Sequence, residues 1–224
     1  MNDLPHNAEE LQEIYGRRFD ATSAYRNETW KVLTSQFFAK YISTSATVLD
    51  LGCGYGEFIN NIKCGLKLAM DLNPSAEGRL SSDVRLIRQD CSLRWDIPDE
   101  SLDVVFTSNF FEHLPDKSTL GKTLDEVSRC LRAGGRLIAM GPNIKYLPGR
   151  YWDFWDHYLP LTELALNEAL SIRGYAIEYS IGKFLPYTLV NAPRYPLIFL
   201  SLYLKLPFAW KVFGRQFLVI AKKK

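Results

Sequence analysis

The sequence predicts an α/β fold, in which helices cover a largely parallel β-sheet. An apolar run at 48–51 breaks into glycines at alternate positions and restarts as an apolar-patterned helix from Glu57. An amphipathic helical pattern at 118–131 is closed by Gly134-Gly135 and followed by an apolar strand at 136–140, which completes a crossover unit. In addition, 224 residues with 47% hydrophobic content can bury the core of one such domain plus an appendage.

Two helices are expected ahead of the glycine-rich stretch, at 7–20 and 24–42. The second has an aromatic stripe at helical spacing, which predicts one face packed on the domain. Its members are Trp30, Leu33, Phe37, Phe38 and Tyr41.

Cysteine usage and the first residues bear on the compartment. The four cysteines lie far apart with no C-x-x-C pair, so neither a zinc site nor a disulfide framework is expected, and a reducing cytoplasm fits best. Residues 1–10 are polar and acidic without an apolar run, so we expect no signal peptide.

Charge is divided sharply along the chain. Residues 1–178 carry all 25 acidic residues against 19 Lys or Arg, a net charge of −6. Residues 179–224 carry eight Lys or Arg and no acid. This asymmetry indicates an anionic surface or substrate near the C-terminal part, without pointing to nucleic acid, because no separate basic groove is evident.

The glycine-rich stretch indicates the type of ligand. A dinucleotide fingerprint needs glycine where Glu57 stands, and a carboxylate at a helix start disfavours a pyrophosphate. Asp50 adds a second negative charge just before the loop, which suits a cationic or neutral ligand. The run Asp50-Leu51-Gly52-Cys53-Gly54-Tyr55-Gly56 closely resembles the first motif of the class I S-adenosylmethionine-dependent methyltransferases, whose ligand has an amine and a sulfonium and no phosphate.

The resemblance implies a three-layer αβα Rossmann-like sandwich with a mostly parallel seven-stranded sheet and an antiparallel last strand. On this basis 1–224 is a single methyltransferase domain. Residues 1–43 form a helical lid over the cofactor, 44–182 the Rossmann-like core, 183–214 an apolar basic insertion and 215–224 the last strand and tail. The candidate inward residues of the lid are Tyr15, Arg17, Arg18 and Phe19, with ordinary packing and solvated arginines as the alternative.

Three later motifs follow in the family's order. A strand at 66–72 ends at Asp71, whose carboxylate can accept both ribose hydroxyls of an adenosine. After a third strand at 84–88, Asp90 resembles the acid that meets the adenine amino group. The stretch 107–115 resembles the fourth motif, the floor between cofactor and substrate. The implied S-adenosylmethionine site comprises Asp50, Gly52, Cys53, Gly54, Gly56, Asp71, Leu72, Asp90, Cys91 and Asn109.

Residues 151–158 hold five aromatics and one histidine in eight positions. They are interpreted either as the wall of an acceptor pocket or as a buried aromatic plug. The candidate catalytic bases are His157, slightly favoured for substrate contact, and His113, with a structural role for each as the alternative. His6 is expected to be irrelevant. No cluster at metal-ligand spacing is found, so no metal is expected.

Residues 184–213 form an apolar segment with only basic charges, interrupted before the ~20 apolar residues that a membrane span needs. This composition favours peripheral contact with an anionic membrane, such as the inner surface of a cytoplasmic membrane. A substrate cap or a dimer contact is the alternative.

The function expected from the resemblance is methyl transfer from S-adenosylmethionine, yielding S-adenosylhomocysteine, to a hydroxyl of a glycan, lipid-linked or secondary-metabolite molecule. The alternatives are a methyltransferase for an aromatic or quinone-like hydroxyl and an inactive S-adenosylmethionine-binding partner subunit. Nucleic acid is not expected as a partner.

Overall fold

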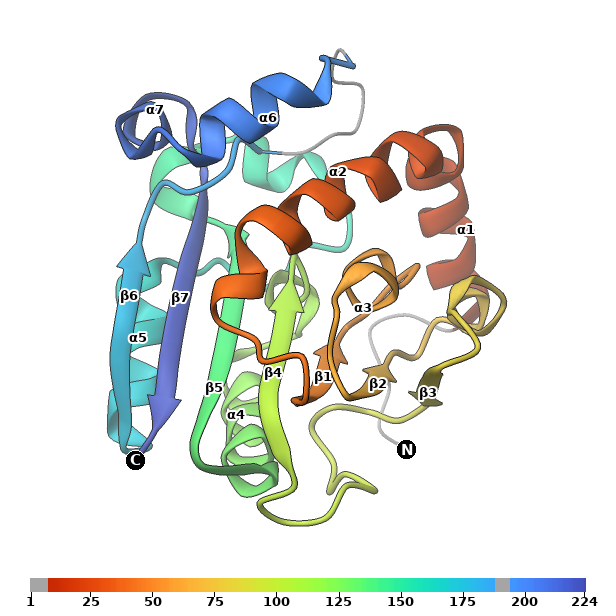
Figure 1. Cartoon of the computed structure of the whole chain (residues 1–224), viewed down its shortest axis with the longest axis vertical. Coiled ribbons are helices and arrows are strands. Elements are labelled where there is room, and N and C mark those ends of the chain that lie inside the picture. Colours follow the sequence, from red (N-terminus) through yellow and green to blue (C-terminus); the bar gives the residue numbers. More distant parts are fainter. Residues whose placement is uncertain (1–7, 188–193) are drawn as a thin grey trace.

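The computed structural model describes residues 8–187 and 194–224. A seven-stranded sheet runs through it in the order β3-β2-β1-β4-β5-β7-β6 (Figure 1). The strands are β1 Thr47–Leu51, β2 Leu66–Met70, β3 Val84–Ile87, β4 Leu102–Ser108, β5 Leu131–Pro142, β6 Tyr175–Ile181 and β7 Gln216–Lys223.

The strand pairing confirms the expected sheet. The pairs β1–β2, β2–β3, β1–β4 and β4–β5 are parallel, whereas β7 is antiparallel to both β5 and β6. The apolar run at 48–51 forms a central strand because it is buried on both faces, as parallel sheets require.

Helices cover both faces of the sheet. They are α1 Ala8–Phe19, α2 Ser23–Gln36, α3 Glu57–Asn61, α4 Lys117–Cys130, α5 Glu163–Ile172, α6 Leu197–Leu204 and α7 Pro207–Phe213. Leu49 and Leu51 point into a core shared with α4 and α5, and Val48 points into one shared with α2, α3 and α6. The alternation of strand side chains therefore builds three layers, and the expected sandwich is confirmed.

The second helix, α2, is shorter than the helix at 24–42 that its aromatic stripe predicted. It ends at Gln36, and the stripe continues through a 3-10 turn at Phe38–Lys40. Phe38 and Trp30 meet Phe106 of β4 at ring-centroid distances of 5.1 and 5.9 Å. The change of helix type turns the aromatic side chains toward the sheet, so that α2 packs beside the carboxyl ends of the strands.

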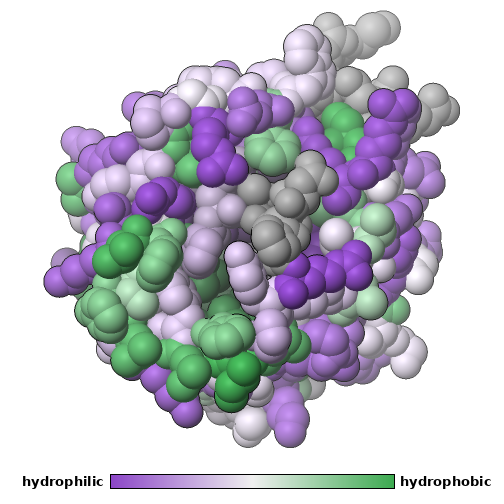
Figure 2. Space-filling view, turned by 90° about the horizontal axis from the view of Figure 1, so that it is seen from above, coloured by the Kyte–Doolittle hydropathy of each residue, from purple (hydrophilic) through white to green (hydrophobic). Residues whose placement is uncertain are grey.

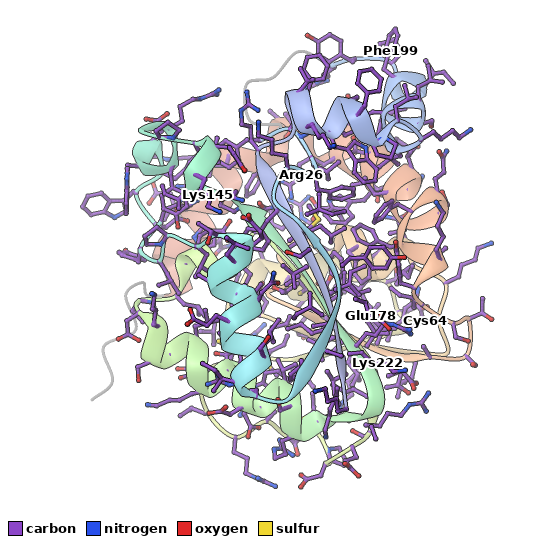
Figure 3. The ribbon with its side chains drawn as sticks, turned by 90° about the vertical axis from the view of Figure 1, so that its left-hand side faces the viewer. Arg26, Cys64, Lys145, Glu178, Phe199 and Lys222 are labelled. Carbon is purple, nitrogen blue, oxygen red and sulfur yellow. The ribbon has the colours of Figure 1, made fainter. Side chains whose placement is uncertain are left out.

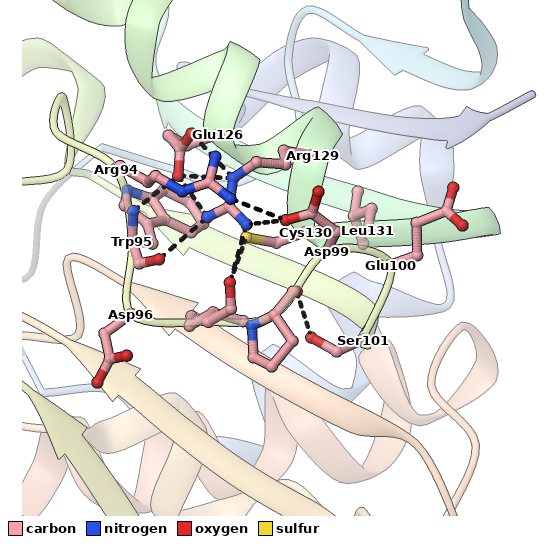
Figure 4. Close-up of polar contacts among 12 residues, drawn as sticks. Arg94, Trp95, Asp96, Asp99, Glu100, Ser101, Glu126, Arg129, Cys130 and Leu131 are labelled. Carbon is pink, nitrogen blue, oxygen red and sulfur yellow. Dashed lines mark hydrogen bonds and ion pairs between the residues drawn. The ribbon is translucent and has the colours of Figure 1, made fainter.

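The irregular segment between β3 and β4 is held by Arg129 of α4. Its guanidinium donates to the backbone oxygens of Trp95 and Ile97 (Figure 4). It also pairs with the carboxylates of Asp99 and Glu126. These bonds fix the segment against α4, at the amino end of β4.

Candidate functional site

A cavity of about 740 Å³ lies at the carboxyl ends of β1 and β4, where open α/β sheets bind their ligands. Its walls come from both N-terminal helices, the glycine turn after β1, the loop after β4, the segment 151–158 and α6, and most of its lining is apolar. The sequence-predicted residues that line it are Asp50, Gly52, Cys53, Gly54, Asn109, His113 and His157, together with Arg18 and Phe19 of the expected lid.

The glycine turn takes a backbone shape that other residues adopt at a cost. Gly52, Gly54 and Gly56 have φ of 70°, 54° and 75°, in the left-handed region. The amides of Gly52 and Cys53 both donate to the backbone oxygen of Met70, which ties the turn to the end of β2. Bare backbone therefore faces the cavity at this point.

Replacing Gly52 with Ala is expected to destabilise the fold by about 2–3 kcal/mol. An alanine is strained in the left-handed backbone conformation, and its Cβ would also overpack the space beside the turn. An added Cβ would lie 2.2 Å from Cγ of Phe110. Gly149→Ala is the matched control, since Gly149 has φ of 82° with nothing within 4 Å of the added carbon. Urea unfolding should place G52A clearly below G149A, and equal losses would contradict the packing argument.

The two acids that frame the turn are buried. Burial raises the pKa of Asp50 well above its usual range, and the charges of Glu57 and Asp71 raise it further. Glu57 accepts from Nε of Arg26 at 2.7 Å, so its charge is offset by an ion pair that the sequence did not indicate. Figure 3 shows Arg26 in the body of the molecule, and its guanidinium lies over the Phe19 ring. Asp50 and Glu57 both line the cavity.

Asp71 supports the turn from outside the cavity lining. Its Oδ2 accepts from the amide of Gly54 at 2.7 Å and its Oδ1 from Asn73 at 2.8 Å. Burial raises its pKa, while these amide donors act in the opposite direction. Asp71 thus stands beside the glycine turn, and its contact with a ribose stays a prediction.

The remaining predicted cofactor residues lie away from the cavity lining. Gly56 is the N-cap of α3. Asp90 accepts from the amide and hydroxyl of Ser92, and Cys91 is buried in the core, where its backbone oxygen accepts from the Trp95 indole. Leu72 follows Asp71 at half-buried exposure. Their contact with a cofactor stays a prediction.

An acidic and histidine-rich group occupies another part of the cavity wall. His113 Nδ1 lies 2.8 Å from the backbone oxygen of Asp156 and 3.3 Å from its Oδ2. The Asp156 carboxylate also accepts from Arg18 at 2.9 Å. Burial raises the pKa of Asp156, but His113 and Arg18 outweigh it and hold the pKa below its usual range. Glu112, which the sequence did not single out, lines the same wall, and burial raises its pKa to about 8.

The aromatic segment combines both of its expected roles. Tyr151 is fully buried and its hydroxyl donates to the backbone oxygen of Leu159, as in a plug. Phe154 and His157 stack and line the cavity, as in a wall. Trp155 is 77% exposed. Burial lowers the pKa of His157 to about 4, so its ring is neutral at pH 7.

The lid residues divide between the cavity and the surface. Arg18 and Phe19 line the cavity. Arg17 points to solvent and pairs with Glu13 one turn away, so the expectation that it faces inward is wrong. The side chain of Tyr15 and the whole of His6 lie outside the described residues.

Comparison with known proteins identifies the domain. A family model described as a methyltransferase domain matches residues 49–139, which run from β1 into β5 and include the glycine turn, Asp71 and Glu112-His113. Over this stretch the chain is similar to the class I S-adenosylmethionine-dependent methyltransferases. The family resemblance seen in the sequence is confirmed, and the cofactor that this family implies is S-adenosylmethionine.

This chain also resembles individual proteins. It is 32% identical over 112 residues to a protein of Mycobacterium tuberculosis named as a probable S-adenosylmethionine-dependent methyltransferase, and 34% identical over 90 residues to one of Mycolicibacterium smegmatis. The first match covers 48% of this chain and 40% of the relative, and the second 39% and 34%. This chain therefore matches less than half the length of these curated relatives.

Two solved structures share its fold. One is a methyltransferase that was solved in complex with the Haloferax volcanii Trm112 methyltransferase activator. The TM-score is 0.68 at 15% identity, and the match covers 95% of this chain and 97% of that chain. The other is an S-adenosylmethionine-dependent methyltransferase of Archaeoglobus fulgidus, with a TM-score of 0.63, 20% identity and coverage of 88% and 94%.

Proposed function

We propose that this protein transfers the methyl group of S-adenosylmethionine to a hydroxyl of an apolar molecule, such as a lipid-linked glycan or a secondary metabolite. The main observation in support is that one mostly apolar cavity extends from the glycine turn to the wall that bears Glu112, His113 and His157. A volume of about 740 Å³ leaves room for an acceptor beside the cofactor. Leu200 and Tyr203 of α6 complete the apolar lining.

Methyl transfer from a sulfonium is an in-line displacement. A lone pair of the acceptor oxygen forms the new bond to carbon while the carbon–sulfur pair returns to sulfur, leaving S-adenosylhomocysteine. The protein's main contributions are to place the oxygen on axis and to exclude water. The hydroxyl proton must also leave, and the two histidines stand on the wall where it can be removed.

Two measurements test this function. Calorimetric titration should show one S-adenosylmethionine and one S-adenosylhomocysteine site per chain, and binding of NAD in their place would overturn the proposal. Incubation with labelled S-adenosylmethionine and fractionated cell extract should then label a lipid-soluble fraction. Label in small aromatic or quinone-like hydroxyls would support the narrower acceptor class, and cofactor binding without any labelled product would support an inactive partner subunit.

The outer face of α6 and α7 supports contact with an anionic membrane. Within the described residues no helix has the length and hydropathy to span a bilayer. Figure 2 shows an apolar area on the face that carries these helices, and Figure 3 shows Phe199 of α6 at the outer end of the molecule. The large side chains that are 45–69% exposed there are Ile198, Phe199, Leu202, Leu206, Phe208, Val212 and Phe213.

Charge favours a lipid occupant for this face. Lys205 and Lys211 are exposed among the apolar side chains, and no acidic residue follows position 178. Apolar bulk flanked by cations alone suits the headgroup region of an anionic bilayer. A membrane at this face would also bring a lipid-linked acceptor close to α6, whose inner side lines the cavity.

The double variant Phe208→Ser and Phe213→Ser is expected to lower vesicle binding at least about tenfold, because two half-exposed rings lose apolar burial. Flotation with phosphatidylcholine–phosphatidylglycerol vesicles measures it. Ile172→Ser is the control, since Ile172 is 78% exposed on α5. A protein partner is the competing occupant of this face, since the Haloferax structure of the same fold is a complex with a protein activator. Absence of flotation by the unaltered protein would favour a protein partner and overturn membrane contact.

A further inference from the structure

The cavity wall brings together three side chains that carry metal-binding atoms. Glu112 and His113 follow β4, and His157 comes from the aromatic segment far along the chain. One ligand atom of each lies within 4.8 Å of the others. Sequence spacing predicted no metal, because the third residue reaches the other two only through the fold.

Backbone hydrogen bonds hold the two segments against each other. The amides of Tyr158 and Leu159 both donate to the backbone oxygen of Glu112, at 2.8 and 3.1 Å. These bonds place His157 beside the loop that carries Glu112 and His113. The grouping is therefore built into the main chain and does not depend on flexible side chains alone.

Both imidazole rings are oriented by their Nδ1 atoms. His157 Nδ1 lies 2.9 Å from the backbone oxygen of Tyr151, and His113 Nδ1 lies 2.8 Å from that of Asp156. A carbonyl oxygen only accepts, so each Nδ1 is the donor, which leaves Nε2 as the ring atom that can bind a metal ion. The Asp156 carboxylate reinforces His113 at 3.3 Å. Metal-binding histidines are oriented in this way, by a carbonyl or carboxylate on the other ring nitrogen.

We propose that Glu112, His113 and His157 bind one divalent cation of the zinc class and leave a coordination position for the acceptor hydroxyl. Two imidazoles and one carboxylate form a donor set of catalytic zinc sites. Ligand atoms about 2.0–2.2 Å from a tetrahedral ion lie roughly 3.4 Å apart. The present atoms lie within 4.8 Å of one another, so they need to close by at most about 1.4 Å. This inference rests on the proposed function, which identifies the acceptor hydroxyl as the group that occupies the open coordination position.

The cation would activate the acceptor oxygen. A hydroxyl bound to a divalent ion loses its proton more readily, and the proton passes to water. The oxygen lone pair then forms the bond to the methyl carbon, and the carbon–sulfur electron pair stays on S-adenosylhomocysteine. Under this proposal the histidines act as ligands and not as general bases.

Metal binding can be measured without any acceptor. Chelator-treated protein, titrated with Zn²⁺ and then gel-filtered, should retain one Zn²⁺ per chain by elemental analysis. Co²⁺ in its place should give the visible absorption bands of a low-coordinate site. Glu112→Gln and His157→Ala should each weaken Zn²⁺ binding at least about tenfold, and Asp156→Asn by about 10–100-fold through His113. Asp153→Asn, which changes an exposed carboxylate of the same aromatic segment, is the matched control and should bind Zn²⁺ as the unaltered protein does.

The outcomes separate this inference from the proposed function. Calorimetry with S-adenosylmethionine on each variant shows whether the fold is retained. Cofactor binding without retained Zn²⁺ would overturn the metal site and leave the methyltransferase proposal intact. Retained Zn²⁺ without cofactor binding would overturn the methyltransferase proposal and leave the metal site intact. Zn²⁺ held equally by E112Q and H157A would place the ion elsewhere and overturn the site.

Discussion

Replacing Asp71 with Asn is expected to weaken S-adenosylmethionine binding at least about 100-fold. The family resemblance assigns this carboxylate to the two ribose hydroxyls, and hydrogen bonds to a charged group contribute about 1.5–3 kcal/mol each. The same side chain holds the glycine turn through the amide of Gly54. Two such bonds together contribute about 3–6 kcal/mol. An amide of the same shape keeps one acceptor oxygen, so the loss falls at the lower end of this sum, about 3 kcal/mol or roughly 100-fold. Calorimetric titration gives the affinity directly.

Asp83→Asn is the control for this substitution. Asp83 lies just before β3, pairs with Lys67 and is mostly exposed, so its replacement removes an acid from the opposite, amino ends of the same strands without touching the turn. We expect D83N to bind the cofactor as the unaltered protein does. If D71N bound S-adenosylmethionine normally, the ribose assignment would be wrong.

Replacing His113 with Ala is expected to lower methyl transfer by about 100–10,000-fold with cofactor affinity changed less than about threefold. A group positioned to remove or weaken the acceptor proton contributes rate enhancements of this size. His113 lies on the cavity wall and is oriented by Asp156, whereas the glycine turn is formed by other residues. Turnover is measured with labelled S-adenosylmethionine and the acceptor fraction identified in extracts.

The thermal midpoint of H113A separates chemistry from folding, and His113→Gln provides a second variant with a polar side chain. Normal turnover in both variants would leave positioning of the acceptor as the mechanism and remove His113 from it. A loss of cofactor affinity equal to the loss of turnover would instead assign His113 to the cofactor site.

The cofactor half of the site was more predictable from sequence than the acceptor half. Asp50, Gly52 and Gly54 are adjacent in the chain, and the end of one strand brings Asp71 beside them, so a local pattern carries most of the geometry. The acceptor wall depends on contacts over long sequence separations, such as Arg18 with Asp156. Sequence periodicity carries no information about such pairs.

Some expectations changed because burial and charge act together in three dimensions. Arg17 shares a helix with Arg18, yet the helix turn sends it to solvent while its neighbour reaches Asp156. Glu57 kept its place at the start of α3, but Arg26 from α2 offsets its charge. Neither outcome follows from residue type, since each depends on which side chain stands opposite.

The sequence alone predicted the order of strands and helices as far as β6, the glycine turn and the family resemblance. These features are local, because hydrophobic period and glycine placement act within a few residues of each other. Only the tertiary structure decided that Glu112, His113 and His157 share one cavity wall, and that α6 lines the cavity on one side while exposing apolar side chains on the other. The physical reason is that packing of distant segments sets these neighbours, through backbone hydrogen bonds and buried area that no single stretch of sequence contains.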